Sequence, residues 1–345
     1  MPDNAIYQCE LLYQRLTDPT ASFFDVRTAI EYFVKYPRER EFVGEQCVAY
    51  ALRYRALRDD LLLPDKAVWG LVQMEAWDEL GRLVCALIAP DEELGWSYYQ
   101  FHDHRRETSL TLRLKLALIE HLSEPVDTAP LWPVLRRYFR RKDKTIRERA
   151  ITLAGELHVV PAYRTLRRIV EDPAQAQLHR QAVKAIGLLN SSAAQRYIIQ
   201  LLRDPERQDL GLLGVSYSCD PKAIPILSNL LADSDSAMMH KDILLILGEI
   251  GGDKAARVLL KHLDGPYRQL VISALGSTGS DIAVPQLKRL LRGRTTSQVN
   301  RDRAAEALSE IDTPKARRVL AATLAKSRKG AASSAGSALS ARRQY

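Results

Sequence analysis

The chain has 345 residues, of which 46% are hydrophobic and 27% charged, and its formal net charge is +8 at pH 7. It contains no run of about 18 apolar residues, which excludes an ordinary transmembrane helix. The first residues lack the basic and apolar regions of a secretory signal, so we expect a cytoplasmic protein.

Charge is distributed unevenly along the chain. Residues 1–100 carry 10 basic and 17 acidic side chains, whereas residues 285–345 carry 14 basic and 4 acidic ones. Fields of opposite sign at the two ends favour a charge-complementary partner protein or head-to-tail self-association.

Residues 1–125 form an acidic, aromatic-rich region, since 16 of the 24 aromatic residues precede residue 102. Apolar spacing predicts six helices there: Ala5–Leu16, Phe23–Lys35, Glu39–Arg58, Asp65–Trp77, Glu79–Ile88 and Thr108–His121. We expect either divergent helical pairs or a helical cap on the repeats described below.

One segment of this region is dense in aromatic, histidine and arginine residues: Trp96–Arg106. Two interpretations remain open, a recognition loop that presents four aromatic side chains or a connection that buries them. The four are Trp96, Tyr98, Tyr99 and Phe101. His102 and His104 lack Cys or acidic partners at ligand spacing, so we predict no metal site.

A strongly basic run follows at Arg136–Arg149. If it is helical, Arg136, Arg137, Arg140 and Arg141 occupy one continuous side, while Leu135, Tyr138 and Phe139 turn inward. The cationic side is a candidate for binding phosphate, nucleic acid or an acidic protein, or it is an ordinary solvated face.

From residue 126 onward, a glycine-marked pattern recurs. The marker positions are Gly155, Gly187, Gly214, Gly248, Gly276 and Ser309, a period typical of stacked helical hairpins. Apolar residues precede each marker at helical spacing, and each such trailing helix follows a leading helix that often opens with proline, as at Pro161, Pro225 and Pro285. The unit around Arg207–Cys219 departs most, with a second glycine at Gly211 and a shortened trailing helix that suggests a kink or joint.

The repeats resemble the HEAT-repeat family, and within it the short repeats of phycobilisome lyases. Residues 146–157, Ile-Arg-Glu-Arg-Ala-Ile-Thr-Leu-Ala-Gly-Glu-Leu, carry the likeness most clearly. The resemblance covers about residues 128–327. It implies an all-α fold, an α-solenoid of antiparallel helix pairs, with about six pairs and a capping helix over 126–327.

Eight residues before the markers stands a basic ladder: Arg147, His179, His240, Arg268 and Arg301. In the resembled repeats this position usually ties the loops together. A row of anion-binding residues is the alternative.

The last segment, 328–345, is basic and rich in Ala and Ser, so we expect it to be disordered. Cys9, Cys47, Cys85 and Cys219 are far apart and lie mostly among apolar residues, which indicates free thiols.

No catalytic constellation, phosphate-binding loop or cofactor motif occurs in the sequence. The sequence therefore favours a non-enzymatic scaffold or adaptor that binds a partner protein on a concave or charged surface and uses no cofactor or metal. Two alternatives remain: a nucleic-acid-binding protein resembling HEAT-like DNA glycosylases, and a bilin lyase or chaperone subunit.

Overall fold

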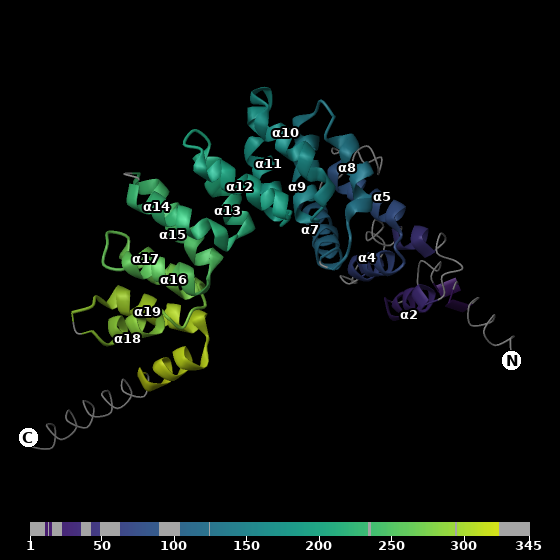
Figure 1. Cartoon of the computed structure of the whole chain (residues 1–345). Helices are drawn as coiled ribbons and strands as arrows, with labels where there is room; N and C mark the ends of the chain where they lie inside the picture. Colours follow the sequence, from purple (N-terminus) through teal and green to yellow (C-terminus); the bar gives the residue numbers. More distant parts are fainter. Residues whose placement is uncertain are drawn as a thin grey trace, which may run out of the picture. The chain divides into compact units, whose positions relative to one another are not determined.

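The computed structural model describes residues 11–12, 14–15, 23–35, 43–48, 63–89, 104–123, 125–233, 236–293 and 295–323. Within these residues the secondary structure is helical, without a strand, and the helices form stacked pairs (Figure 1). The predicted all-α solenoid fold is confirmed. None of the helices in the described ranges is long and apolar enough to cross a lipid bilayer.

The chain divides into two compact units, Met1–Ala194 and Gln195–Tyr345, and we describe each separately. This division falls within a helix, α12 (Ser192–Arg203). The boundaries expected at residues 125 and 327 stay a prediction.

The first unit begins with α2 (Phe23–Lys35), α4 (Leu63–Gln73), α5 (Trp77–Ile88) and α7 (His104–His121). Helix α4 packs against α2, α5 and α7. Four of the six predicted helices in this region therefore exist, although α7 begins four residues before the expected Thr108. Parts of the other two, Ala5–Leu16 and Glu39–Arg58, lie outside the described residues.

The repeats of the first unit follow as α8 (Trp132–Tyr138), α9 (Lys144–Glu156), α10 (Tyr163–Glu171) and α11 (Ala176–Leu188). Helix α9 packs against α8 and α11, and α10 packs against α11. The second unit continues with α13 (Gln208–Ser218), α14 (Ile224–Asp233), α15 (Ala237–Ile250), α16 (Gly252–Lys261), α17 (Arg268–Ser277), α18 (Val284–Arg292) and α19 (Gln298–Ile311). Residues 314–323 are also helical.

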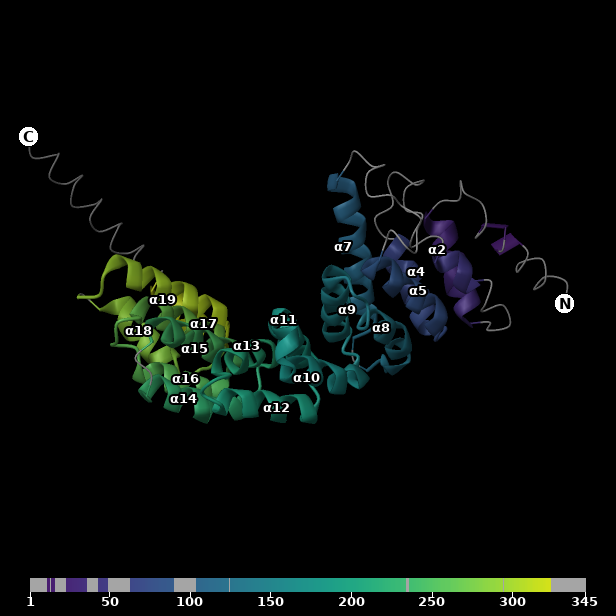
Figure 2. The ribbon, with the colours of Figure 1, turned by 90° about the horizontal axis from the view of Figure 1, so that it is seen from above.

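The odd-numbered helices of the second unit are the trailing ones, and they lie side by side in the order α13, α15, α17 and α19 (Figures 1 and 2). Side-chain caps start two of them. Ser236 Oγ accepts a hydrogen bond from the Met239 amide at 3.3 Å, and Ser297 Oγ accepts one from the Asn300 amide at 3.4 Å. Each cap satisfies a backbone donor that has no partner within its helix.

The marker glycines lie inside the trailing helices, and Gly155, Gly248 and Gly276 each face the next trailing helix. A methyl group on Gly248 would come within 3.1 Å of Ala274 Cα, and one on Gly276 within 2.8 Å of Ala307 Cα. Ala274 and Ala307 both stand two residues before the following marker. Small residues at both positions therefore let successive backbones approach closely.

Positive backbone φ angles close several helices. Gly251 has φ +72° and Gly279 has φ +62°, values that favour glycine. Gly211, the glycine of α13 that is not a marker, makes a different contact. It lies tight against the backbone of Leu202 in α12.

Candidate partner-binding surfaces

The basic run of the first unit forms the end of α8 and the turn after it. Leu135, Tyr138 and Phe139 are buried, as their spacing predicts, while Arg136 and Arg137 are exposed. The apolar anchors therefore hold the arginines at the surface.

The expectation that four arginines share one helical side is wrong in part. Helix α8 ends at Tyr138, so Arg140 and Arg141 lie in a turn rather than on the helix. The next helix, α9, begins after its cap Asp143, whose Oδ1 accepts a hydrogen bond from the Ile146 amide at 3.1 Å. Both arginines are exposed in this turn, and the Arg141 guanidinium lies 6.0 Å from the Tyr138 ring centroid.

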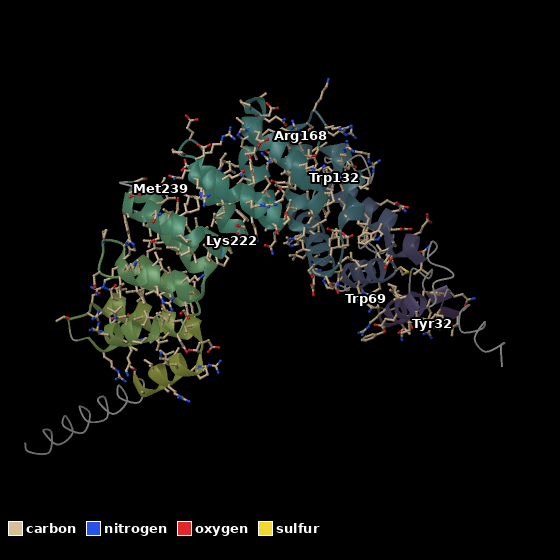
Figure 3. The ribbon with its side chains drawn as sticks, viewed as in Figure 1. Tyr32, Trp69, Trp132, Arg168, Lys222 and Met239 are labelled. Carbon is tan, nitrogen blue, oxygen red and sulfur yellow. The ribbon has the colours of Figure 1, made fainter. Side chains whose placement is uncertain are left out.

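Two further exposed arginines lie on α10 of the same unit. Helix α8 contacts the short 3₁₀ segment Val160–Ala162, which leads directly into α10. Arg164 and Arg168, one turn apart on α10, are both exposed. Figure 3 shows Arg168 on α10 and Trp132 on α8. This pair was not among the residues expected from the sequence, although its four-residue spacing places both arginines on one side of a helix.

We call Arg136, Arg137, Arg140, Arg164 and Arg168 the basic face. Within the described part of the chain, none of the five forms an ion pair, whereas neighbouring Arg167 pairs with Glu171 at 2.8 Å. The positive charge of the basic face is therefore not neutralised by ion pairs with the described residues.

A shallow hollow of about 380 Å³ adjoins Arg164. It is lined by Val160, Pro161, Tyr163, Arg164, Ser191 and Ala193. Val160 is 48% exposed, so an apolar contact lies directly beside the cations.

The basic ladder makes mainly local hydrogen bonds to backbone. His179 Nε2 donates to the carbonyl oxygen of Asp172 at 2.9 Å, and His240 Nε2 donates to that of Leu231 at 3.0 Å. Arg301 Nη1 donates to the carbonyl oxygens of Gly293 at 3.4 Å and Thr296 at 2.6 Å. These acceptors lie at or just beyond the end of the preceding leading helix, where a donor satisfies carbonyl groups left without a helical partner.

The two other members of the ladder have side-chain partners. Arg147 Nη2 donates to Gln175 Oε1, and Gln175 Nε2 donates to Asp172 Oδ2 at 2.8 Å. The hydrogen bonds from the Gln175 side chain and the Ala174 amide lower the pKa of the Asp172 carboxyl group. Arg268 pairs with Asp264 at 3.1 Å on an exposed part of α17.

Most of the aromatic segment Trp96–Arg106 is not among the residues that the structure describes. Trp96, Tyr98, Tyr99 and Phe101 lie outside the described residues, as do His102 and the segment 328–345. His104 to Arg106 are helical and belong to α7 rather than to a loop.

Within the described ranges, no three His, Cys, Asp or Glu side chains come together in a way that would hold a metal ion. Cys47 and Cys85 are buried, Cys219 is half-buried, and none of the three forms a disulfide with a residue that the structure describes. Cys9 lies outside the described residues. Burial, with a smaller effect of the Glu79 carboxylate, raises the pKa of the Cys47 thiol to about 12.

Comparison with known protein families identifies HEAT repeats in the C-terminal part of the chain. Residues 259–340 match the family model for HEAT repeats, which confirms the predicted HEAT repeats over that segment. No curated protein matches significantly.

Two solved structures align with much of the chain. One is human deoxyhypusine hydroxylase in complex with glycerol, with 18% identity, a TM-score of 0.31, and coverage of 73% of this chain and 91% of that one. The other is the complex of CpcE and CpcF of phycocyanin lyase from Nostoc sp. PCC7120, with 16% identity, a TM-score of 0.33, and coverage of 82% and 94%. Both TM-scores are too low to bear on the function of this chain.

Proposed function

We propose that this HEAT-repeat chain is a non-enzymatic scaffold or adaptor that holds an acidic partner protein against the basic face of its first unit. The observation that carries the proposal is a set of exposed arginines without ion-pair partners among the described residues. An acidic surface gains favourable contacts with them and breaks no existing ion pair of these arginines.

The composition of the basic face supports a protein partner. Arginine is enriched at protein interfaces, and its planar guanidinium binds a carboxylate through two parallel hydrogen bonds. The hollow beside Arg164 offers Val160, Pro161 and Tyr163 for apolar contact. A partner surface that combines carboxylates with an apolar side chain fits both features.

The test is capture of partners from the native host with the full-length chain, followed by mass spectrometry. We expect acidic proteins to be retained by the wild type and lost from the Arg136→Glu/Arg137→Glu variant. The matched control is Lys254→Glu/Arg257→Glu, which removes the same charge from exposed positions of α16 in the second unit. Equal loss of the captured proteins from both variants contradicts a specific role for the basic face.

The same preparation tests the alternatives. Retention of duplex DNA at low salt in a gel shift, lost in the Arg136→Glu/Arg137→Glu variant, favours nucleic-acid binding. Attachment of bilin to an acceptor subunit on co-expression favours the lyase or chaperone alternative. Sedimentation of the purified chain at several concentrations tests head-to-tail self-association.

A further inference from the structure

A second hollow lies in the second unit, along the N-terminal halves of three trailing helices. Its volume is about 470 Å³. Lys241 of α15, residues 268–270 of α17, and Asn300 and Arg303 of α19 line it, together with Pro266 and Tyr267. Helix α15 packs against α17, and α17 packs against α19, so three consecutive repeats contribute to one surface (Figure 2).

All the charged residues that line this hollow are cations: Lys241, Arg268 and Arg303. Arg268 shares its charge with Asp264 at 3.1 Å. Lys241 and Arg303 form no ion pair with any residue that the structure describes. The hollow is therefore electropositive.

Neighbouring contacts fix the position of the cations. Arg303 Nη1 donates to Ser273 Oγ at 3.1 Å, and Ser273 Oγ donates to the carbonyl oxygen of Gln269 at 3.3 Å. Lys241 Nζ lies 5.8 Å from the Tyr267 ring centroid. This arrangement holds Arg303 from α19 against α17.

The start of α17 adds to the positive potential. Tyr267 precedes the helix and supplies no side-chain hydrogen bond to its first turn. The first amide groups of a helix carry partial positive charge and attract anions when no cap occupies them. Gln269 and Leu270, both in this turn, line the hollow.

Exposed apolar side chains flank the cations on two of the three helices. Met238 is 69% exposed and Leu245 46% exposed, and both share one side of α15 with Lys241 because they lie three and four residues from it. Val299 is 51% exposed and lies one turn before Arg303 on α19. A surface that only bound phosphates would gain nothing from these side chains, whereas an acidic peptide with apolar side chains contacts both kinds of group.

We propose that the hollow and its apolar rim bind an acidic peptide segment of a partner protein that also carries large apolar side chains. This inference rests on the proposed scaffold function but concerns the other unit. Three packed helices at about 10 Å spacing place their outer axes about 20 Å apart. An extended segment of about seven residues covers that distance.

The experiment uses the full-length chain and fluorescein-labelled synthetic peptides of about ten residues, a length that exceeds the span of the hollow. One peptide alternates Glu with Leu and Phe, a second replaces Glu by Gln, and a third replaces the apolar residues by Ala. Fluorescence anisotropy measures their affinities at low and physiological salt. We expect the first peptide to bind most tightly, with an affinity that falls as salt rises.

The decisive variant combines Lys241→Glu with Gln269→Glu, and the second of these substitutions is chosen to preserve the fold. It is nearly isosteric, lies at an exposed position, and puts a carboxylate in the first turn of α17, where negative charge favours the helix. We expect Gln269→Glu with Lys241→Glu to lower peptide affinity about tenfold without loss of thermal stability. The control Lys254→Glu/Arg257→Glu removes more charge from α16 and should change the affinity less than about twofold.

Three results would overturn the inference: undetectable binding of the first peptide at low salt, unchanged affinity in the Gln269→Glu/Lys241→Glu variant, or equal binding of the Gln-substituted peptide. Tighter binding of a labelled single-stranded oligonucleotide that the same variant abolishes would assign the hollow to nucleic acid. The Arg136→Glu/Arg137→Glu variant should leave peptide affinity unchanged. Failure of the partner capture on the basic face is therefore distinguishable from failure here.

Discussion

Gly155 of α9 lies directly against Ala185 of α11, so closely that a methyl group on Gly155 would come within 2.6 Å of Ala185 Cα. The same relationship joins Gly248 to Ala274 and Gly276 to Ala307 in the second unit. A glycine on one trailing helix and an alanine on the next thus set the distance between repeats.

Replacing Gly155 or Gly276 with alanine should destabilise the protein. In a helix with free space the change from Gly to Ala is favourable by up to about 1 kcal/mol, but here the added methyl meets backbone atoms. We expect a loss of about 1–3 kcal/mol, measured as a lower midpoint of thermal or urea unfolding.

Ser309 provides the matched control, since it occupies the marker position of α19 and is exposed. Within the described residues no trailing helix packs on it. Ser309→Ala should change stability by less than about 0.5 kcal/mol. Equal destabilisation by Ser309→Ala and Gly276→Ala would contradict the packing explanation.

Arg301→Ala should also lower the unfolding midpoint. The substitution leaves the carbonyl groups of Gly293 and Thr296 without a charged donor, and hydrogen bonds to charged groups contribute about 1.5–3 kcal/mol each. For comparison, Arg268→Ala removes an exposed ion pair to Asp264 and should cost less than about 1 kcal/mol. Loss of partner binding in Arg301→Ala without loss of stability would favour an anion-binding use of the ladder.

His262 predicts a pH dependence of stability. Burial, followed by the charges of His240 and Lys261, lowers the pKa of His262 below its ordinary value near 6.5. The unfolded chain therefore binds the proton more readily, so His262 lowers stability as the pH falls below its unfolded pKa. Urea unfolding midpoints of the wild type and of His262→Gln should follow the same pH trend above pH 7, which is about half a unit above the unfolded pKa of histidine. Below pH 7 the two trends should diverge, and the midpoint of the wild type should fall faster.

Cys47 should not react in the folded protein. Its side chain is fully buried, and its raised pKa of about 12 leaves almost no thiolate at pH 8, which is near the ordinary pKa of a cysteine. Iodoacetamide labelling with peptide mapping should modify half-buried Cys219 well before Cys47 and Cys85. Rapid labelling of Cys47 under native conditions would show that the α4 neighbourhood opens locally.

Much of the fold follows from local patterns that a sequence displays. The expected helix Phe23–Lys35 matches α2 because its apolar spacing is regular over the whole segment. The marker glycines are conspicuous in a helical pattern because they lack a side chain, and at Gly155, Gly248 and Gly276 they coincide with close helix packing. The start of α7 is harder to predict, since the polar residues His104 to Thr108 offer no apolar periodicity.

The surfaces were less predictable than the fold. Arg164 and Arg168 belong to a different repeat from the α8 arginines, and the contact that links the two repeats, between α8 and the segment Val160–Ala162, depends on how they stack. The hollow between α15, α17 and α19 draws on residues up to 62 positions apart, from Lys241 to Arg303. Charge runs are visible in a sequence, whereas neighbours that come from different repeats are not.

The Gly–Ala spacing has a consequence for how such a protein changes over evolutionary time. Since the hollow takes one wall from each of three successive repeats, duplication of a single segment of about 30 residues would lengthen its cationic row by one step. The inserted trailing helix would carry its own glycine and alanine, so it could pack closely against the trailing helices on both sides. In this architecture the length of the binding surface can therefore change without a change in the core of each repeat. A longer or shorter ligand is accommodated by adding or removing repeats.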